Sequence, residues 1–184
     1  MEVVIILRLE NLDEKTRKLM LEELELDIKN NTLYISPRLT EFCKGKYAKL
    51  LREAMTSGND MTLARSLRKS GCLKPYETRR MRNGSYRQVK VPKNAAETLA
   101  EGEFNRFYIR ALCRRVIDEG RGYLEVYRAK QVSNPRPESE RKIGKKVDPH
   151  KLLHDLRTSP GVEPALGIPP GPNSGLSVRI KFND

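Results

Sequence analysis

The sequence has no tryptophan, few aromatic residues and few cysteines. Aromatic side chains make up only 6% of the 184 residues, so an apolar core has to be mainly aliphatic. The three cysteines, Cys43, Cys72 and Cys113, are odd in number, far apart and without a C-x-x-C pair. This spacing disfavours a disulfide framework or a zinc knuckle, and it predicts reduced, structural thiols.

Long hydrophobic runs are also absent. The longest run near the start, Val3 to Leu7, is far too short to cross a bilayer. A signal peptide is not predicted either, because no basic N-terminal region followed by an apolar segment is present. We therefore expect a cytoplasmic protein that has no membrane partner.

Acidic residues are nearly missing from residues 62–93. This stretch holds ten Lys or Arg against one acid, Glu77, which is a net charge of +9 out of +12 for the whole chain. Charge concentrated in this way indicates a polyanionic partner, because neutralising phosphates releases their counterions. The predicted partner is a nucleic acid, either DNA or RNA.

The same stretch predicts a basic β-hairpin at residues 74–93. Asn83-Gly84 is the preferred pair for a type I′ turn, in which both central residues need positive φ. Tyr76 and Tyr86 alternate with arginines, so a base could stack on them if the partner is single-stranded. The predicted phosphate contacts are Arg79, Arg80, Arg82, Arg87, Lys90 and Lys93. The alternative is a solvated loop that meets an acidic protein surface.

The longest predicted helix covers residues 94–119. Asn94 and Glu97 have the spacing of a capping box, and an apolar stripe with steps of three and four follows. Gly102 interrupts this pattern at a cost of about 1 kcal/mol relative to Ala, which predicts close contact with a neighbour at that point.

Arg106, Arg110 and Arg114 stand at every fourth position of this helix. Like charges at this spacing repel each other by a few tenths of a kcal/mol per pair, so we expect anions beside them. Two interpretations stay open. Nucleic-acid phosphates would add the three arginines to the predicted interface, whereas Glu125 or other strand acids would pair them within the chain.

The other elements complete an α+β fold. They are predicted strands at 2–8, 32–36, 123–132 and 176–182, helices at 13–29, 39–55, 60–70 and 148–156, and a loop at 133–147. We expect one domain over residues 1–184, with a small mixed sheet packed against the long central helix. The basic hairpin protrudes as an arm, and residues 158–175 form an extended Pro/Gly-rich segment.

Signs of enzyme or metal chemistry are weak. Asp118 followed by Glu140-Arg141-Lys142 imitates the acid and E-x-K order of metal-dependent nucleases, but that motif needs a strand and here lies in a predicted loop. His150 and His154 could share a metal, yet no third histidine completes a site. We therefore predict no metal and no cofactor, and a nuclease is the third candidate function.

The order of a basic hairpin, a long helix and a strand resembles the extended loop and spine helix of tailed-phage capsid proteins. This resemblance covers a minor part of the chain and implies a structural, self-assembling protein as the second candidate, with other subunits or further copies as partners. The first prediction is a non-enzymatic nucleic-acid-binding protein, or a subunit of a nucleoprotein complex, that contacts phosphates through the hairpin.

Overall fold

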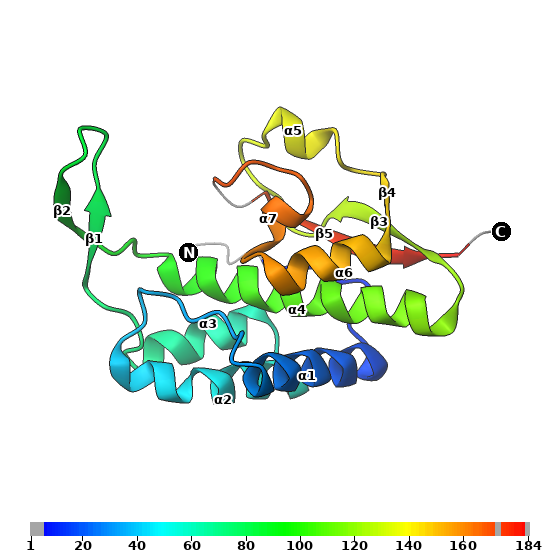
Figure 1. Cartoon of the computed structure of the whole chain (residues 1–184), viewed down its shortest axis with the longest axis horizontal. Coiled ribbons are helices and arrows are strands. Elements are labelled where there is room, and N and C mark those ends of the chain that lie inside the picture. The colour runs from blue at the N-terminus through cyan, green and yellow to red at the C-terminus, as the bar shows by residue number, and fades with distance from the viewer. Residues whose placement is uncertain (1–5, 172–173, 183–184) are drawn as a thin grey trace.

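The computed structural model describes residues 6–171 and 174–182 (Figure 1). In chain order the elements are α1 (Glu14–Lys29), α2 (Glu41–Ser57), α3 (Asp60–Lys69), β1 (Tyr76–Arg80), β2 (Tyr86–Lys90), α4 (Ala95–Glu119), β3 (Tyr123–Arg128), α5 (Pro137–Glu140), β4 (Lys146–Val147), α6 (Pro149–Thr158), α7 (Val162–Ala165) and β5 (Leu176–Lys181). The predicted α+β class is confirmed. Within the described part of the chain, no helix is long and apolar enough to cross a membrane.

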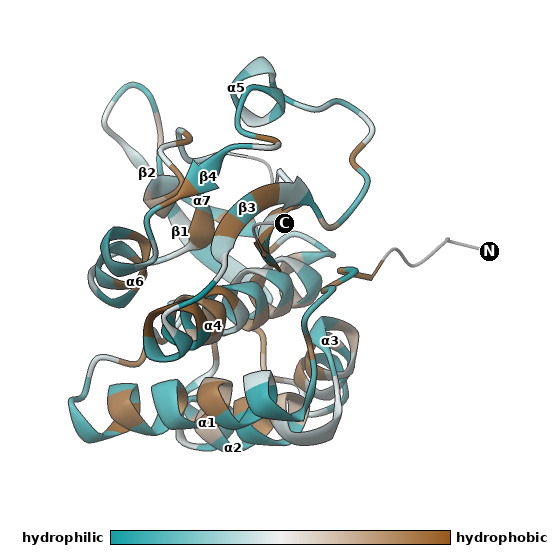
Figure 2. Cartoon of the chain, turned by 90° about the vertical axis from the view of Figure 1, so that its right-hand side faces the viewer, coloured by the Kyte–Doolittle hydropathy of each residue, from teal (hydrophilic) through white to brown (hydrophobic). Residues whose placement is uncertain are grey.

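Helix α4 is the centre of the molecule. Helices α1, α2 and α3 lie on one side of it, and the sheet of β3, β4 and β5 lies with α6 and α7 on the other (Figure 1). Phe104, Phe107, Tyr108, Ile109 and Leu112 are all fully buried, although they point to different sides of the helix. A helix that is buried on most of its sides is typical of a core element, and Figure 2 shows apolar segments of α4 at the centre of the molecule.

The central sheet has the order β4-β3-β5. The predicted pairing of the last strand with β3 is confirmed, with Leu124 opposite Ile180 and Val126 opposite Val178. In β3 the alternating residues Leu124 and Val126 are buried, as the period of two requires. In β5 three consecutive residues, Leu176, Ser177 and Val178, are buried, and the Ser177 hydroxyl donates to Asn105 of α4. Every strand pair in the described residues is antiparallel, so the expectation of a mixed sheet is wrong.

Capping residues begin most of the long helices. The Asp13 side chain accepts a hydrogen bond from the Thr16 amide at 2.9 Å, and Asp148 accepts one from Lys151 at 2.9 Å. The predicted capping box of α4 is wrong, because Asn94 forms no side-chain cap. Glu97 is instead paired with Arg68, whose guanidinium lies 2.6 Å away.

Several segments differ from the sequence-based expectation. The predicted strand at 2–8 lies partly outside the described residues, and 6–8 form no strand, although the Arg8 amide donates to the Ala129 carbonyl. Residues 32–36 run as irregular chain without a partner strand. The predicted loop at 133–147 contains α5 and β4, and the segment 158–175 contains α7.

The cysteine prediction is wrong for one pair. Cys43 and Cys72 form a disulfide, both fully buried, while Cys113 is free and buried. The two cysteines meet because the chain before α2 runs beside the chain after α3, where the Thr40 amide donates to the Cys72 carbonyl at 2.8 Å. This contact joins residues far apart in sequence, so cysteine spacing alone does not report it.

Candidate nucleic-acid interface

Strands β1 and β2 form the predicted hairpin, which stands clear of the rest of the molecule (Figure 1). Its turn is not the predicted type I′. The Gly84 amide donates to the Met81 carbonyl at 3.0 Å and the Met81 amide to the Ser85 carbonyl at 2.8 Å, which closes a three-residue loop. Gly84 has φ of 82°, whereas Asn83 does not have positive φ. This is the pattern of a type I turn followed by a glycine bulge.

The hairpin has two chemically different faces. Directly opposite residues share a face, and side chains alternate along each strand. The tyrosine face carries Tyr76, Thr78, Arg80, Tyr86, Gln88 and Lys90. The glutamate face carries Glu77, Arg79, Arg87 and Val89. Two side-chain hydrogen bonds agree with this division: Gln88 donates to Thr78 at 2.9 Å on the first face, and Arg79 donates to Glu77 at 2.8 Å on the second.

Glu77 anchors the root of the hairpin. Arg38 donates to its two carboxylate oxygens at 2.6 and 3.0 Å, and Arg79 donates to it as well. These hydrogen bonds, first from Arg38 and then from Arg79, lower the pKa of Glu77 to about 2. The only acid of the basic stretch is therefore ionised, paired and turned away from the tyrosine face.

The tyrosine face is open to solvent. Tyr76 is 52% exposed and Tyr86 is 69% exposed, and Arg80 and Lys90 are exposed beside them. Across the described chain, no carboxylate pairs with Arg80, Arg82, Arg87, Lys90 or Lys93. An isolated two-stranded hairpin is at best marginally stable in water. A surface this exposed, basic and aromatic is suited to a bound polyanion.

The arginine row of α4 has the opposite surroundings. Arg110 is fully buried, with its guanidinium 2.8 Å from Glu23 and 2.7 Å from Asp27. Arg106 is also buried, 3.1 Å from Glu103 and 3.7 Å from Asp27. Neither side chain can contact a nucleic acid in this fold, so that part of the predicted interface is wrong.

Apart from Glu103 of α4 itself, the partners of the row come from α1 and not from the strand acids considered above. Arg114, which is partly exposed, lies 2.8 Å from Glu22. Burial raises the pKa of Glu23, but hydrogen bonds from Arg157 and the charge of Arg110 outweigh it and hold that pKa below its ordinary value. The sequence signal for this pairing is the run of acids in residues 13–29, but nothing in the sequence connects that run to α4.

The residues with nuclease-like or metal-like spacing do not form a site. Asp118 is exposed near the end of α4, and Glu140 is in helix α5, where it pairs with Arg128. His150 and His154 are exposed on α6. No group of three metal-ligating side chains converges anywhere in residues 6–171 and 174–182.

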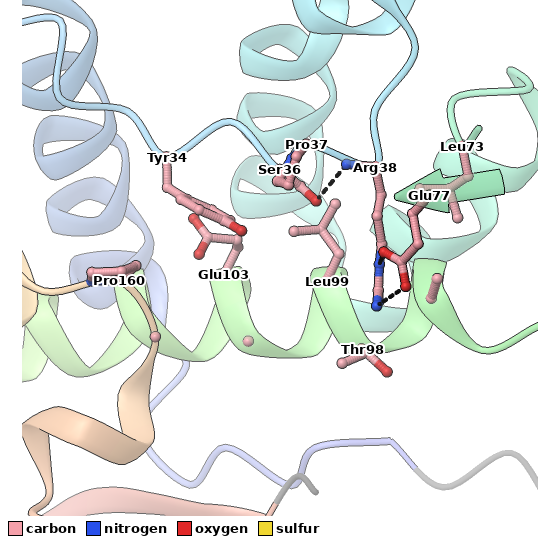
Figure 3. Close-up of a pocket in the computed structure, with 13 residues that line it drawn as sticks. Tyr34, Ser36, Pro37, Arg38, Leu73, Glu77, Thr98, Leu99, Glu103 and Pro160 are labelled. Carbon is pink, nitrogen blue, oxygen red and sulfur yellow. Dashed lines mark hydrogen bonds and ion pairs between the residues drawn. The ribbon is translucent and has the colours of Figure 1, made fainter. Parts of the chain in front are cut away.

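A cavity of about 430 Å³ lies at the root of the hairpin (Figure 3). Its lining includes Tyr34, Arg38 and Glu77 on one side and Gly102 and Glu103 of α4 on the other. Neither Tyr34 nor Glu103 is among the residues predicted from the sequence to form a site. No motif marks them, because they are brought together only when the segment before α2 lies across α4.

Comparisons of the chain with protein-family models, with curated proteins and with solved structures find no match. The candidate interface therefore depends on the geometry and the charge described above.

Proposed function

We propose that this chain binds nucleic acid, alone or as a subunit of a nucleoprotein complex, through the tyrosine face of its hairpin. The observation that carries the proposal is the exposure of Tyr76 and Tyr86 beside Arg80 and Lys90, on a face without an acid. Stacking of a base on an aromatic ring contributes about 1–3 kcal/mol, and Arg and Lys supply phosphate contacts. Single-stranded nucleic acid is the form that presents free bases to such a face.

The hairpin acts as a binding arm in this proposal, without catalysis. Its residues are nearly all exposed, and the Glu77–Arg38 pair ties its root to the body. A bound nucleic-acid strand would supply the packing contacts that the exposed hairpin lacks. The cytoplasmic location remains a prediction. The Cys43–Cys72 disulfide argues against it, because such bonds are uncommon in that compartment.

Two double variants with the same loss of charge test the proposed face. Arg80→Ser with Lys90→Ser alters the tyrosine face, and Arg79→Ser with Arg87→Ser alters the glutamate face. Binding of a labelled single-stranded oligonucleotide is measured by fluorescence anisotropy across a range of salt concentrations. The first variant should bind more weakly and flatten the slope of log affinity against log salt by about 0.7 for each lost phosphate contact.

The glutamate-face variant is the matched control and should change affinity much less. Tyr76→Ala with Tyr86→Ala should weaken binding by about tenfold or more at an unchanged salt slope, because stacking is not electrostatic. All three variants should remain folded, since exposed substitutions change stability by about 0.5 kcal/mol or less. Unchanged affinity in both tyrosine-face variants would remove the proposal. Light scattering on the same samples tests the self-assembly alternative, which predicts defined oligomers without nucleic acid.

A further inference from the structure

A groove runs over α4 from the hairpin root toward β5. The cavity of about 430 Å³ at the root and a second one of about 450 Å³ share Thr98, Gly102, Pro160 and Gly161 in their linings, so they adjoin. Gly102 forms part of the floor. A Cβ at this position would meet no atom within 4 Å, which contradicts the close contact that the sequence predicted there. Glycine leaves open space here, at a cost to the helix.

Glu103 supplies a buried carboxyl group to the lining of the root cavity. Its residue is 3% exposed, and Arg106 donates to its Oε2 at 3.1 Å. Among the described residues, no donor contacts the other carboxyl oxygen, Oε1. Tyr34 and Glu103 both line the cavity, and Figure 3 shows that they come from the segment before α2 and from α4 respectively. A buried carboxyl group with a free acceptor is costly unless a partner reaches it.

The charges of the groove do not suit a phosphate. Arg38 is the only cation in the two linings, and Glu77 neutralises it. The acids Glu101 and Glu163 of the second cavity are held by Lys130 and Arg136, at 2.6 and 2.8 Å. An uncharged ligand with N–H donors fits this lining better than an anion does. A planar heterocycle could place its face on Tyr34 and its donors on Glu103.

We propose that the root cavity binds one unpaired nucleobase of the strand that the hairpin holds, with Glu103 accepting from its Watson–Crick edge and Tyr34 against its face. This inference depends on the proposed function, because the hairpin brings the strand to the mouth of the cavity. Enzymes that read extruded bases combine edge hydrogen bonds with aromatic and apolar walls in the same way. Leu99 and Pro160 supply the apolar wall here.

The test uses the four ribonucleosides as probes, because they carry a base and no phosphate. Each is titrated into the full chain at concentrations up to millimolar, and backbone amide resonances are followed by NMR. We expect saturable shifts at residues around Tyr34, Gly102 and Glu103 for at least one nucleoside. Gly102→Leu places a side chain in the open space of the floor and should weaken this binding about tenfold or more.

Gly102→Ala is the matched control, since it changes the same helix position but leaves most of the cavity open. Its nucleoside affinity should stay within about threefold of the wild-type value. Glu103→Gln, which keeps the size but replaces an acceptor by a donor, should weaken the preferred nucleoside most. Absence of saturable shifts with all four nucleosides, or equal binding by a folded Gly102→Leu variant, overturns the inference.

The experiments distinguish failure of the base-cavity proposal from failure of the proposed nucleic-acid binding by the hairpin. The Arg80→Ser, Lys90→Ser variant should lose oligonucleotide affinity and still bind the nucleoside. If the nucleosides fail while the oligonucleotide binds in a hairpin-dependent way, only the base cavity is wrong. If the oligonucleotide fails to bind at all, the proposed function is wrong, whatever the nucleosides do.

Discussion

The arginines of the hairpin and those of α4 look alike in sequence but have opposite surroundings in the fold. Arg80 and Lys90 are exposed with no acid on their face, whereas Arg110 is fully buried between Glu23 and Asp27. Both sets are dense and basic. The difference is that α1 supplies acids to α4, whereas no element in the described part of the chain supplies them to the tyrosine face. A basic row therefore indicates a binding surface only when the fold leaves it without carboxylates.

The largest expected effect is a loss of stability when a buried arginine of α4 is replaced. Arg110→Met leaves Glu23 and Asp27 without their main buried partner, and uncompensated buried charge costs about 3–5 kcal/mol of the free energy of unfolding. Urea unfolding followed by circular dichroism measures it. Arg114→Met, on the same row but partly exposed, is the control and should cost about 1 kcal/mol or less. Equal small losses in the two variants would mean that Arg110 is not the paired core residue described here.

The next largest expected effect is the loss of stability when the disulfide near the hairpin root is reduced. The Cys43–Cys72 bond closes a loop with a sequence separation of 29, which is expected to stabilise the fold by about 3–4 kcal/mol. Urea unfolding with and without a reductant should show this difference, and a Cys43→Ser, Cys72→Ser variant should not respond to reductant. Three free thiols in the folded, air-oxidised protein would contradict the assignment.

Glu103 gives a pH-dependent contrast between core and hairpin carboxylates. Burial raises its pKa from 4.5 to about 7, against the opposing influence of Arg106, while Asp27 adds to the rise and Arg110 opposes it. Between these two values the folded state holds a proton that the unfolded state has lost, so the free energy of unfolding falls as pH rises. The shift corresponds to a loss on the order of 3 kcal/mol.

Glu103→Gln should remove this fall. The free energy of unfolding of the variant minus that of the wild type should therefore increase from pH 4.5 to 7, and urea titrations at several pH values measure it. Glu77→Gln is the comparison. The pKa of Glu77 is lowered to about 2, so this carboxylate stays ionised in the folded state throughout the pH range of the titrations. A difference curve for Glu103→Gln that stays flat would show that its carboxyl is already ionised at pH 5.

The smallest effect is a gain in stability. Gly102→Ala in α4 should raise the free energy of unfolding by about 0.5–1 kcal/mol, because Ala restricts the unfolded chain and favours the helix, and its Cβ meets no neighbour. Thermal and urea unfolding both measure it. A loss of stability would mean that the floor of the groove is closed, which would also count against the base cavity.

Local patterns predicted the elements whose causes are local. Helical spacing located α1 and α6, and strict alternation located β5 and its place beside β3. Asn83-Gly84 correctly located the hairpin turn but not its type, because only Gly84 adopts positive φ.

What the sequence could not predict depends on distant contacts. The burial of Arg110 depends on acids more than eighty positions away, and the Cys43–Cys72 bond on the path of the chain before α2. Tyr34 and Glu103 likewise lie in no motif, and the apolar spacing of 32–36 resembles a strand that finds no partner. These features follow from tertiary placement, which periodicity and composition do not encode.

Hydrogen–deuterium exchange with and without a single-stranded oligonucleotide tests the central claim most directly, because it reports where the strand lies. The free hairpin is exposed on both faces, so its amides should exchange readily. A saturating oligonucleotide should protect β1 and β2, together with residues around Tyr34 and Glu103, and leave α1 and the Arg110 region unchanged. Protection confined to other surfaces, with hairpin exchange unaltered in the presence of bound oligonucleotide, would contradict the central claim.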